Sequence, residues 1–327
     1  MKEPKRTKDG RLKSVSYAKW GYIFITPFFL AYIFFTLVPQ FLTVYNSFFE
    51  NYRDGLTQIG PKFVGLDNYK TLFTADSAGV IRILKYTGNV IILWILGAVP
   101  QFVIALLLAI FFTSYRLNIK GQGFFKTVIY MPNLIMAAAF SMLFFALFSR
   151  VGPIQAFLEQ KGVLDHSFDF FAHRVTVRGM IALMNFLMWF GNTTIVLMAG
   201  IMGIDQSMFE SATIDGANSV QVFFRVTMPL LMPIFVYCLI TAMIGGIQMF
   251  DVPEVLTKGN GAPNETTRTL VMYLNGYMRN YNDGMAGAIS VYIFLITGGL
   301  GIVVYRMLTR QYREPRRLHR QRKGNVL

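Results

Sequence analysis

The sequence predicts an all-α polytopic membrane protein with six transmembrane helices and a cytoplasmic helix-turn-helix segment. Hydrophobic residues make up 54% of the 327 residues. Six long runs contain no charged side chain, and a bilayer-spanning helix needs about 20 such residues. A compact polar stretch between the fourth and fifth runs carries helix-start signals. Helices are expected because lipid cannot form hydrogen bonds with the free backbone N–H and C=O groups at the edge of an open sheet.

The six uncharged runs define one membrane domain over residues 20–309, between tails 1–19 and 310–327. The first run is too long for the core of a cleaved signal peptide, and no small-residue cleavage pattern follows it. We place the runs at roughly 20–45, 86–112, 127–149, 179–203, 228–250 and 284–305.

The distribution of basic residues predicts that both termini are cytoplasmic. The tail through Lys19 has seven Lys or Arg and two acidic residues, and the tail from Arg306 has eight and one. Short basic segments stay in the cytoplasm. With six spans, the segment between the fourth and fifth runs is then cytoplasmic as well.

That polar segment predicts two short helices joined by a turn. Ser207 and Glu210 have capping-box spacing, which would place Glu210 in the first helical turn, and Asn218 and Gln221 repeat the spacing. Gly216 between them follows an Asp and permits a sharp turn. A rigid helix pair at the cytoplasmic surface indicates a contact site for a partner.

The same segment resembles the EAA loop of binding-protein-dependent ABC importer permeases, over about residues 204–233. In that family the loop is a coupling helix that docks on a separate ATPase subunit. The resemblance therefore implies ATPase-coupling roles for Glu210, Ser211, Ala212, Asp215, Gly216, Ala217, Gln221, Phe223 and Pro229.

Four further stretches are similar to carbohydrate permeases of the maltose-permease type. They are Phe63–Tyr69, Tyr130–Pro132, Gly203–Asp205, and Phe250-Asp251 with Leu256-Thr257. Residues 258–263 depart from the family's Gly-Gly-Pro pattern, so contacts to an external partner transfer less directly than those to the ATPase. The order of the stretches extends the resemblance over nearly the whole chain outside the tails.

The resemblance implies a bacterial-type inner-membrane assembly in which this chain forms half of a sugar pathway. Its expected partners are a second homologous permease, an ABC ATPase dimer, an extracytoplasmic solute-binding protein and a sugar. The chain has no phosphate-binding loop of the form G-x-x-x-x-G-K-[ST]. We therefore expect no cofactor and no enzymatic activity in this chain, with ATP and Mg bound by the ATPase.

Other functional classes fit the sequence less well. An ion-coupled secondary carrier usually has charged residues within its spans, and these runs have none. A same-family permease for a non-sugar solute and a non-transporting scaffold for an ATPase stay open. One Cys and three scattered His residues predict no metal site. The net charge of +14 lies mostly in the tails, without a nucleic-acid-binding signature.

Polar and aromatic residues within the spans are candidates for the substrate pathway. Asn185, Trp189 and Asn192 share one helix face, where amides can bind sugar hydroxyls and an indole can stack on a sugar ring. The alternative is that such residues, and the glycines in particular, serve helix packing. Correspondence with maltose-type permeases supports the three and adds Ala242, Gly245, Gly246 and Met249, with polar Gln248 adjacent.

Overall fold

A computed structural model describes residues 18–114, 120–165 and 167–310. Nearly all of both basic tails lies outside these ranges. Six helical segments among the described residues are long and apolar enough to cross a membrane. They are Lys19–Asn46, Arg82–Thr113, Ala137–Gln160, Arg174–Met202, Ser219–Leu256 and Asp283–Thr309. The prediction of a six-span helical membrane protein is confirmed.

The described residues are helical apart from one β-hairpin and the connecting loops. In chain order the helices and strands are α1 (Ala18–Tyr32), α2 (Val38–Asn46), β1 (Phe49–Asp54), β2 (Thr57–Phe63), α3 (Asp67–Leu72), α4 (Arg82–Thr113), α5 (Gln122–Tyr130), α6 (Ala137–Phe148), α7 (Pro153–Gln160), α8 (Arg174–Met202), α9 (Gln206–Ile214), α10 (Ser219–Val222), α11 (Met228–Ile247), α12 (Asp251–Leu256), α13 (Leu270–Arg279) and α14 (Asp283–Thr309).

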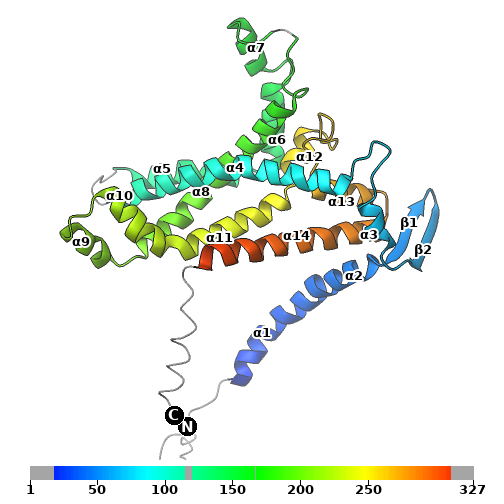
Figure 1. Ribbon diagram of the computed structural model, residues 1–327, viewed down its shortest axis with the longest axis horizontal. Helices are drawn as coiled ribbons and strands as arrows, with labels where there is room; N and C mark the ends of the chain where they lie inside the picture. Colours follow the sequence, from blue (N-terminus) through cyan, green and yellow to red (C-terminus); the bar gives the residue numbers. More distant parts are fainter. Residues whose placement is uncertain (1–17, 115–119, 166, 311–327) are drawn as a thin grey trace, which may run out of the picture.

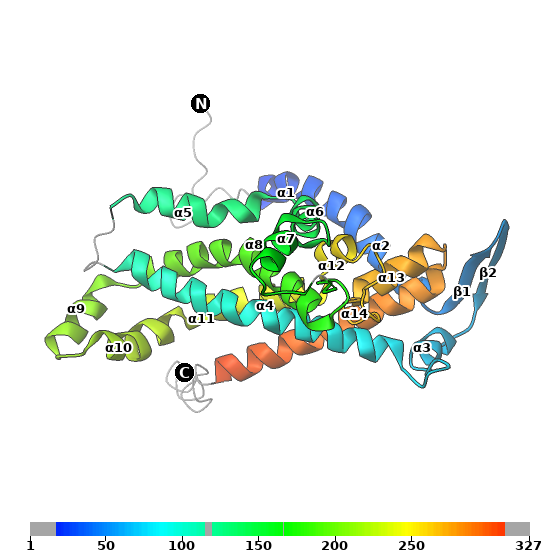
Figure 2. The same ribbon diagram turned by 90° about the horizontal axis from the view of Figure 1, so that it is seen from above.

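Helices α4, α8, α11 and α14 run side by side along the long axis of the molecule (Figure 1). The α9–α10 pair lies at one end of this axis and the β-hairpin lies at the other, in both views (Figure 2). Helix α1 leans away from the bundle (Figure 1), and its residues from Lys19 to Tyr32 are all exposed. The helix pair and the hairpin are therefore separated by the length of the spans.

Helices α4 and α8 form the most extensive helix pair in the described part of the chain. A Cβ added at Gly97 of α4 would lie 3.2 Å from the carbonyl oxygen of Ala182 in α8, so the two backbones approach closely. Buried Gln101 of α4 donates to the Thr193 hydroxyl of α8 at 2.8 Å. A side-chain hydrogen bond between buried polar groups fixes how two membrane helices are rotated against each other.

The prediction of one continuous third span over 127–149 is wrong. Helix α5 ends at Tyr130, a 3₁₀ turn covers Met131–Leu134, and α6 starts at Ala137 after an extended residue. Pro132 explains the break, because it lacks an N–H and its ring clashes with the preceding turn. The Asn133 amide donates to the Met188 carbonyl of α8 at 2.9 Å, which holds the break against the bundle.

A wide π-helical turn precedes each of two prolines near span ends. One covers Ile33–Leu37 ahead of Pro39, and the other covers Phe223–Thr227 ahead of Pro229. A proline cannot donate to the carbonyl four residues before it, and a π turn is one way for a helix to absorb that mismatch. The chain from α10 to α11 therefore stays helical through Pro229.

The β-hairpin was not predicted, because its strands are short and largely polar. It is fixed to the end of the bundle by side chains. The Asn51 amide donates to Asp283 at 3.2 Å, and the Asn68 amide donates to the Ser47 and Phe49 carbonyls. Strand β1 pairs antiparallel with β2, with an irregularity in register between Glu50 and Tyr52.

Candidate functional site

The segment after α8 folds into two short helices at an angle, as the sequence predicted. Asp215 ends α9, and Gly216 follows with φ of 75°, a left-handed conformation that glycine adopts without strain. The Ala217 N–H donates back to the Ala212 carbonyl at 3.0 Å, which closes the turn. The short connection from α8 (residues 203–205) and the glycine turn set the position of this pair relative to the bundle.

The two predicted caps have different outcomes. The Asn218–Gln221 capping box is confirmed, with both reciprocal hydrogen bonds at 2.9 Å. The Ser207–Glu210 box is wrong, because Asp205 caps α9 by accepting from the Ser207 N–H at 2.9 Å. The pKa of Asp205 is lowered, mainly by the hydrogen bond from the Ser207 backbone N–H and to a smaller extent by the Ser207 hydroxyl.

This earlier helix start changes the position of Glu210. The prediction that it lies in the first helical turn is wrong, since Glu210 is the fifth residue of α9. Its carboxylate accepts from the Gln206 amide at 3.0 Å, one turn earlier on the same helix. Glu210 therefore caps no backbone group.

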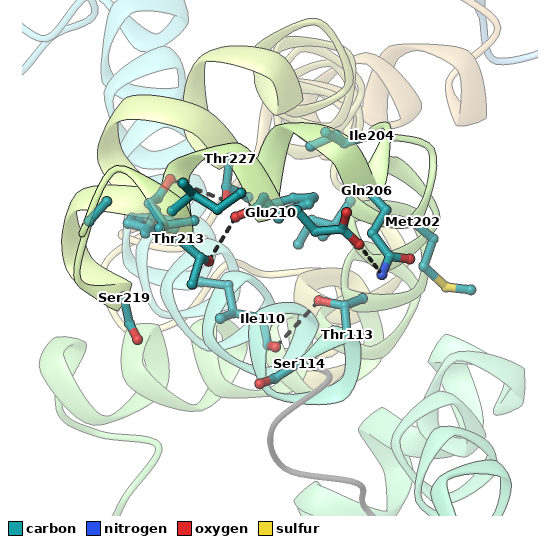
Figure 3. A pocket seen from close by; sticks show the side chains of 16 residues that line it. Ile110, Thr113, Ser114, Met202, Ile204, Gln206, Glu210, Thr213, Ser219 and Thr227 are labelled. Carbon is teal, nitrogen blue, oxygen red and sulfur yellow. Dashed lines mark hydrogen bonds between the residues drawn. The ribbon is translucent and has the colours of Figure 1, made fainter.

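The helix pair and the ends of α4 and α8 line an open cavity of about 730 Å³ (Figure 3). Figure 3 shows Glu210 and Gln206 of α9 on one wall, with Thr113, the last residue of α4, and the following Ser114 across the cavity. Three of the predicted coupling residues line this cavity: Glu210, Ala217 and Phe223. These three therefore contact the space between the helix pair and the spans.

The other coupling residues lie on the helices and their junctions. Ser211, Asp215, Gly216 and Gln221 are exposed, whereas Ala212 and Pro229 are partly buried. Sequence reasoning missed a set of exposed apolar side chains on the same pair, although apolar residues within a polar segment were a usable signal. They are Met208, Ile214, Val220 and Phe224, with Ile214 86% exposed.

The polar face of α8 divides into two environments. The Asn185 amide donates to the Ile181 carbonyl at 2.9 Å and to the Met249 sulfur at 3.5 Å, so Asn185 joins α8 to the residues after α11. Trp189 is 48% exposed, one turn further along. Asn192 is partly buried. Trp189 is therefore the only one of the three whose side chain is largely exposed.

The remaining pathway candidates do not surround one cavity. Gly246 packs against the Trp94 indole of α4, whereas Gly245 has no heavy atom within 4 Å of its Cβ position. Ala242 packs among the apolar residues between α4, α8 and α11. Gln248 lines a shallow groove beside Phe294 and Thr297 of α14. The eight predicted residues thus lie on several surfaces of α8, of α11 and of the residues that follow α11.

No group of His, Cys, Asp and Glu side chains that could hold a metal ion occurs in the part of the chain that the structure describes. The native Cys238 is buried.

Curated relatives cover most of the chain. It is 30% identical over 290 residues to "Probable ABC transporter permease protein YesP" of Bacillus subtilis, which covers 88% of this chain and 89% of the relative. It is 29% identical to "Arabinooligosaccharides transport system permease protein AraP" of the same organism, over 90% of each chain. "Multiple sugar-binding transport system permease protein MsmF" of Streptococcus mutans is 29% identical, over 88% of this chain and 94% of the relative.

A solved structure shares the fold. The chain superposes with a TM-score of 0.70 and 19% identity on one chain in the crystal structure of a bacterial ABC transporter involved in the import of the acidic polysaccharide alginate. The match covers 89% of this chain and 96% of that chain. The family model described as "Binding-protein-dependent transport system inner membrane component" matches residues 82–314. This multi-pass membrane protein therefore belongs to the binding-protein-dependent transport system inner membrane component family.

Proposed function

We propose that this chain is one permease subunit of an ABC importer and forms half of the membrane pathway for a sugar or oligosaccharide. Two ATPase subunits bind ATP and Mg below it, a second homologous permease completes the pathway, and a solute-binding protein delivers the sugar. Both termini and the α9–α10 pair face the cytoplasm. Family membership favours this importer over the ion-coupled secondary carrier.

The observation that carries the ATPase contact is the rigid, exposed α9–α10 pair. Two of its exposed apolar side chains, Met208 and Ile214, lie outside the membrane spans, where apolar surface is usually covered by a partner. The glycine turn and the Asn218 cap hold the two helices at a fixed angle. A stiff pair of helices can transmit a displacement, whereas a flexible loop would absorb it.

The coupling follows from differential contact with two states of the transporter. ATP binding draws the two ATPase subunits together, and the α9–α10 pair moves with the subunit on which it docks. A ligand shifts a conformational equilibrium only when it interacts differently with the two states. Docking on α9–α10 supplies that difference, and the connection from α8 to α9 carries it into the spans.

The sugar assignment is supported by the relatives. AraP and MsmF are named for arabinooligosaccharides and multiple sugars, and they match nearly the whole chain. A further relative, "sn-glycerol-3-phosphate transport system permease protein UgpA" of Agrobacterium fabrum, is 26% identical over 89% of this chain. A glycerol phosphate is therefore the alternative solute of the same family.

The test is reconstitution of the complete transporter in proteoliposomes. We expect a binding protein loaded with an oligosaccharide to stimulate ATP hydrolysis and drive uptake of the labelled sugar. Stimulation by glycerol 3-phosphate alone would replace the sugar with the alternative solute. Solute uptake that needs an ion gradient and no ATP would overturn the importer assignment.

A further inference from the structure

The 257–269 segment, which joins α12 to α13, is hydrogen-bonded to α4 and α8, two spans that are distant from it in sequence. It lies toward the β-hairpin end of the molecule, away from α9 and α10 (Figure 1). Its contacts reach α4 through Tyr86 and Asn89, and α8 through Arg178. The segment thus connects the neighbouring ends of α4 and α8.

Arg178 is the contact from α8. Its Nε donates to the Thr266 carbonyl at 3.0 Å, and its Nη2 donates to the same oxygen at 2.9 Å. Nη2 also donates to the Asn89 side-chain oxygen at 2.8 Å. The planar guanidinium therefore bridges the segment and α4 at once, which a lysine cannot do because its ammonium lacks this fork of donors.

Asn89 completes the bridge from α4. Its amide nitrogen donates to the Glu265 carbonyl at 2.8 Å and to the Arg268 carbonyl at 3.1 Å, while its oxygen accepts from Arg178. Asn89 is only 4% exposed. Three hydrogen bonds from one buried amide fix the segment against α4, because leaving any of these groups unpaired would be costly.

The Glu265 side chain adds an ionic contact beside this bridge. Its carboxylate accepts from the Tyr86 hydroxyl at 2.9 Å, from Arg268 at 2.7 Å and from Lys85 at 3.3 Å. Burial would raise the pKa of Glu265, but the hydrogen bonds from Tyr86, Arg268 and Lys85 outweigh that effect and lower it. The carboxylate is therefore ionised in the folded protein at neutral pH.

The backbone of the segment is held in an unusual conformation. Lys258, Asn264 and Glu265 have φ between 51° and 56°. Residues other than glycine avoid this left-handed region, and they remain in it only where surrounding contacts hold them there. The conformation of the segment therefore depends on its attachment to α4 and α8.

Helix α8 connects this attachment to the candidate coupling helix. Arg178 lies in the second turn of α8, which continues without a break to Met202. Three residues later α9 begins, capped by Asp205. A single helix of about 40 Å therefore has the 257–269 segment bonded near one end and α9 connected to the other.

We propose that Arg178 is a positioning residue of the transport cycle, which joins the 257–269 segment to α8 so that a protein docking on the segment displaces α8 and, with it, α9. The partner is the solute-binding protein, because the segment lies at the end of the spans opposite the ATPase contact. The inference rests on the proposed function, since it requires a binding protein at one end and an ATPase at the other.

The experiment uses the complete transporter in nanodiscs and measures ATP hydrolysis with and without its solute-loaded binding protein. The wild-type complex is measured first. Absence of stimulation there would contradict the proposed function itself. Once stimulation is established for the wild type, Arg178→Lys and Asn89→Asp test the positioning role separately from the proposed function. Arg178→Lys weakens the attachment of the segment to α8, and Asn89→Asp weakens its attachment to α4. Arg178→Lys keeps the charge, and Asn89→Asp keeps the acceptor for Arg178 while losing both donations to the segment.

We expect both variants to assemble and to keep basal ATP hydrolysis, while stimulation by the binding protein falls at least about fivefold, the low end of typical coupling between two sites. The matched control is Arg174→Ala, an exposed arginine one turn earlier on α8, which should leave stimulation unchanged. Unchanged stimulation in the Arg178 and Asn89 variants would overturn the proposal. So would an equal loss of basal and stimulated hydrolysis, or failure of both variants to assemble, because the cluster would then serve only the fold.

Discussion

Gly246 of α11 lies directly against the indole of Trp94 in α4, where an added Cβ would be 2.6 Å from Trp94 Cγ. Its neighbour Gly245 has no heavy atom within 4 Å of the same position. Two adjacent glycines therefore face different environments.

This pair separates helix packing from a pathway role. We expect Gly246→Ala to destabilise the protein by about 1–3 kcal/mol, because the methyl group must displace a packed aromatic ring. Gly245→Ala should leave stability nearly unchanged. Thermal unfolding of the purified variants, followed by size-exclusion chromatography, measures both. Equal melting temperatures for the two variants would contradict the close packing on Trp94.

Gly216 forms the turn between α9 and α10. Alanine there meets no neighbour, but its left-handed conformation costs a non-glycine residue about 1–2 kcal/mol. We expect Gly216→Ala to change the angle of the pair and to reduce sugar-stimulated ATP hydrolysis, with the chain still in the membrane. Gly123→Ala in α5 is the control, since it also meets open space but has an ordinary helical backbone. A normal response in the Gly216 variant would argue against docking through a fixed angle.

Trp189 is the exposed aromatic ring on the polar face of α8. If it stacks on the sugar, Trp189→Ala should lose on the order of 1 kcal/mol of interaction, or about a fivefold decrease in uptake. Assembly should be unaffected. Leu183→Ala, an exposed residue on another side of the same helix, is the control and should transport normally. A variant that assembles poorly but transports normally per complex would assign Trp189 to packing.

The Glu265 cluster predicts a pH dependence of stability. The folded protein lowers the pKa of this carboxyl below its ordinary value of 4.5. Its ionic contacts therefore stabilise the fold above about pH 4.5, and this stabilisation disappears as the pH falls through the lowered value. Glu265→Gln should be less stable than the wild type at pH 7, and the difference should shrink toward pH 4. A constant difference in melting temperature across that range would exclude the ionised carboxylate as its source.

The six-span topology predicts which exposed sites an impermeant thiol reagent reaches in intact cells. Ser77→Cys and Leu56→Cys should be labelled, because the proposed orientation places the segment between the first two spans outside the cell. Ile214→Cys, exposed at the tip of α9, should be labelled only after the membrane is permeabilised. The native Cys238 is buried and should contribute little background. Labelling of Ile214→Cys in intact cells would invert the proposed orientation.

Much of the architecture could be predicted from the sequence. The thickness of the hydrocarbon core and the need to hydrogen-bond every backbone group within it leave few alternatives to a helix for each of the six uncharged runs. The turn at Gly216 and the cap at Asn218 were also predictable from local chemistry. The start of α9 was not, because Asp205 and Ser207 both suit an N-cap and only the structure shows which accepts the hydrogen bond.

The arrangement within the membrane was harder to predict. Pro132 was visible in the sequence, but a proline can kink a helix or end it, and the contact of Asn133 with α8 decides the outcome. The Arg178–Asn89 bridge joins residues 89 positions apart, so no local pattern marks it. For the same reason the sequence could not separate Gly246, which packs on Trp94, from Gly245, which does not.

The π-helical turn at Phe223–Thr227 joins α10 to α11, and it determines how the side chains of α10 are rotated about the helix axis relative to those of α11. A π turn holds about one residue more than an α-helical turn, so deleting a single residue there would restore a regular helix. The deletion would also turn α10 by about 100° around the axis of α11. Val220 and Phe224 would then point in another direction with their chemistry unchanged. The chain can therefore tolerate changes in side chains on this surface more readily than a change in its length.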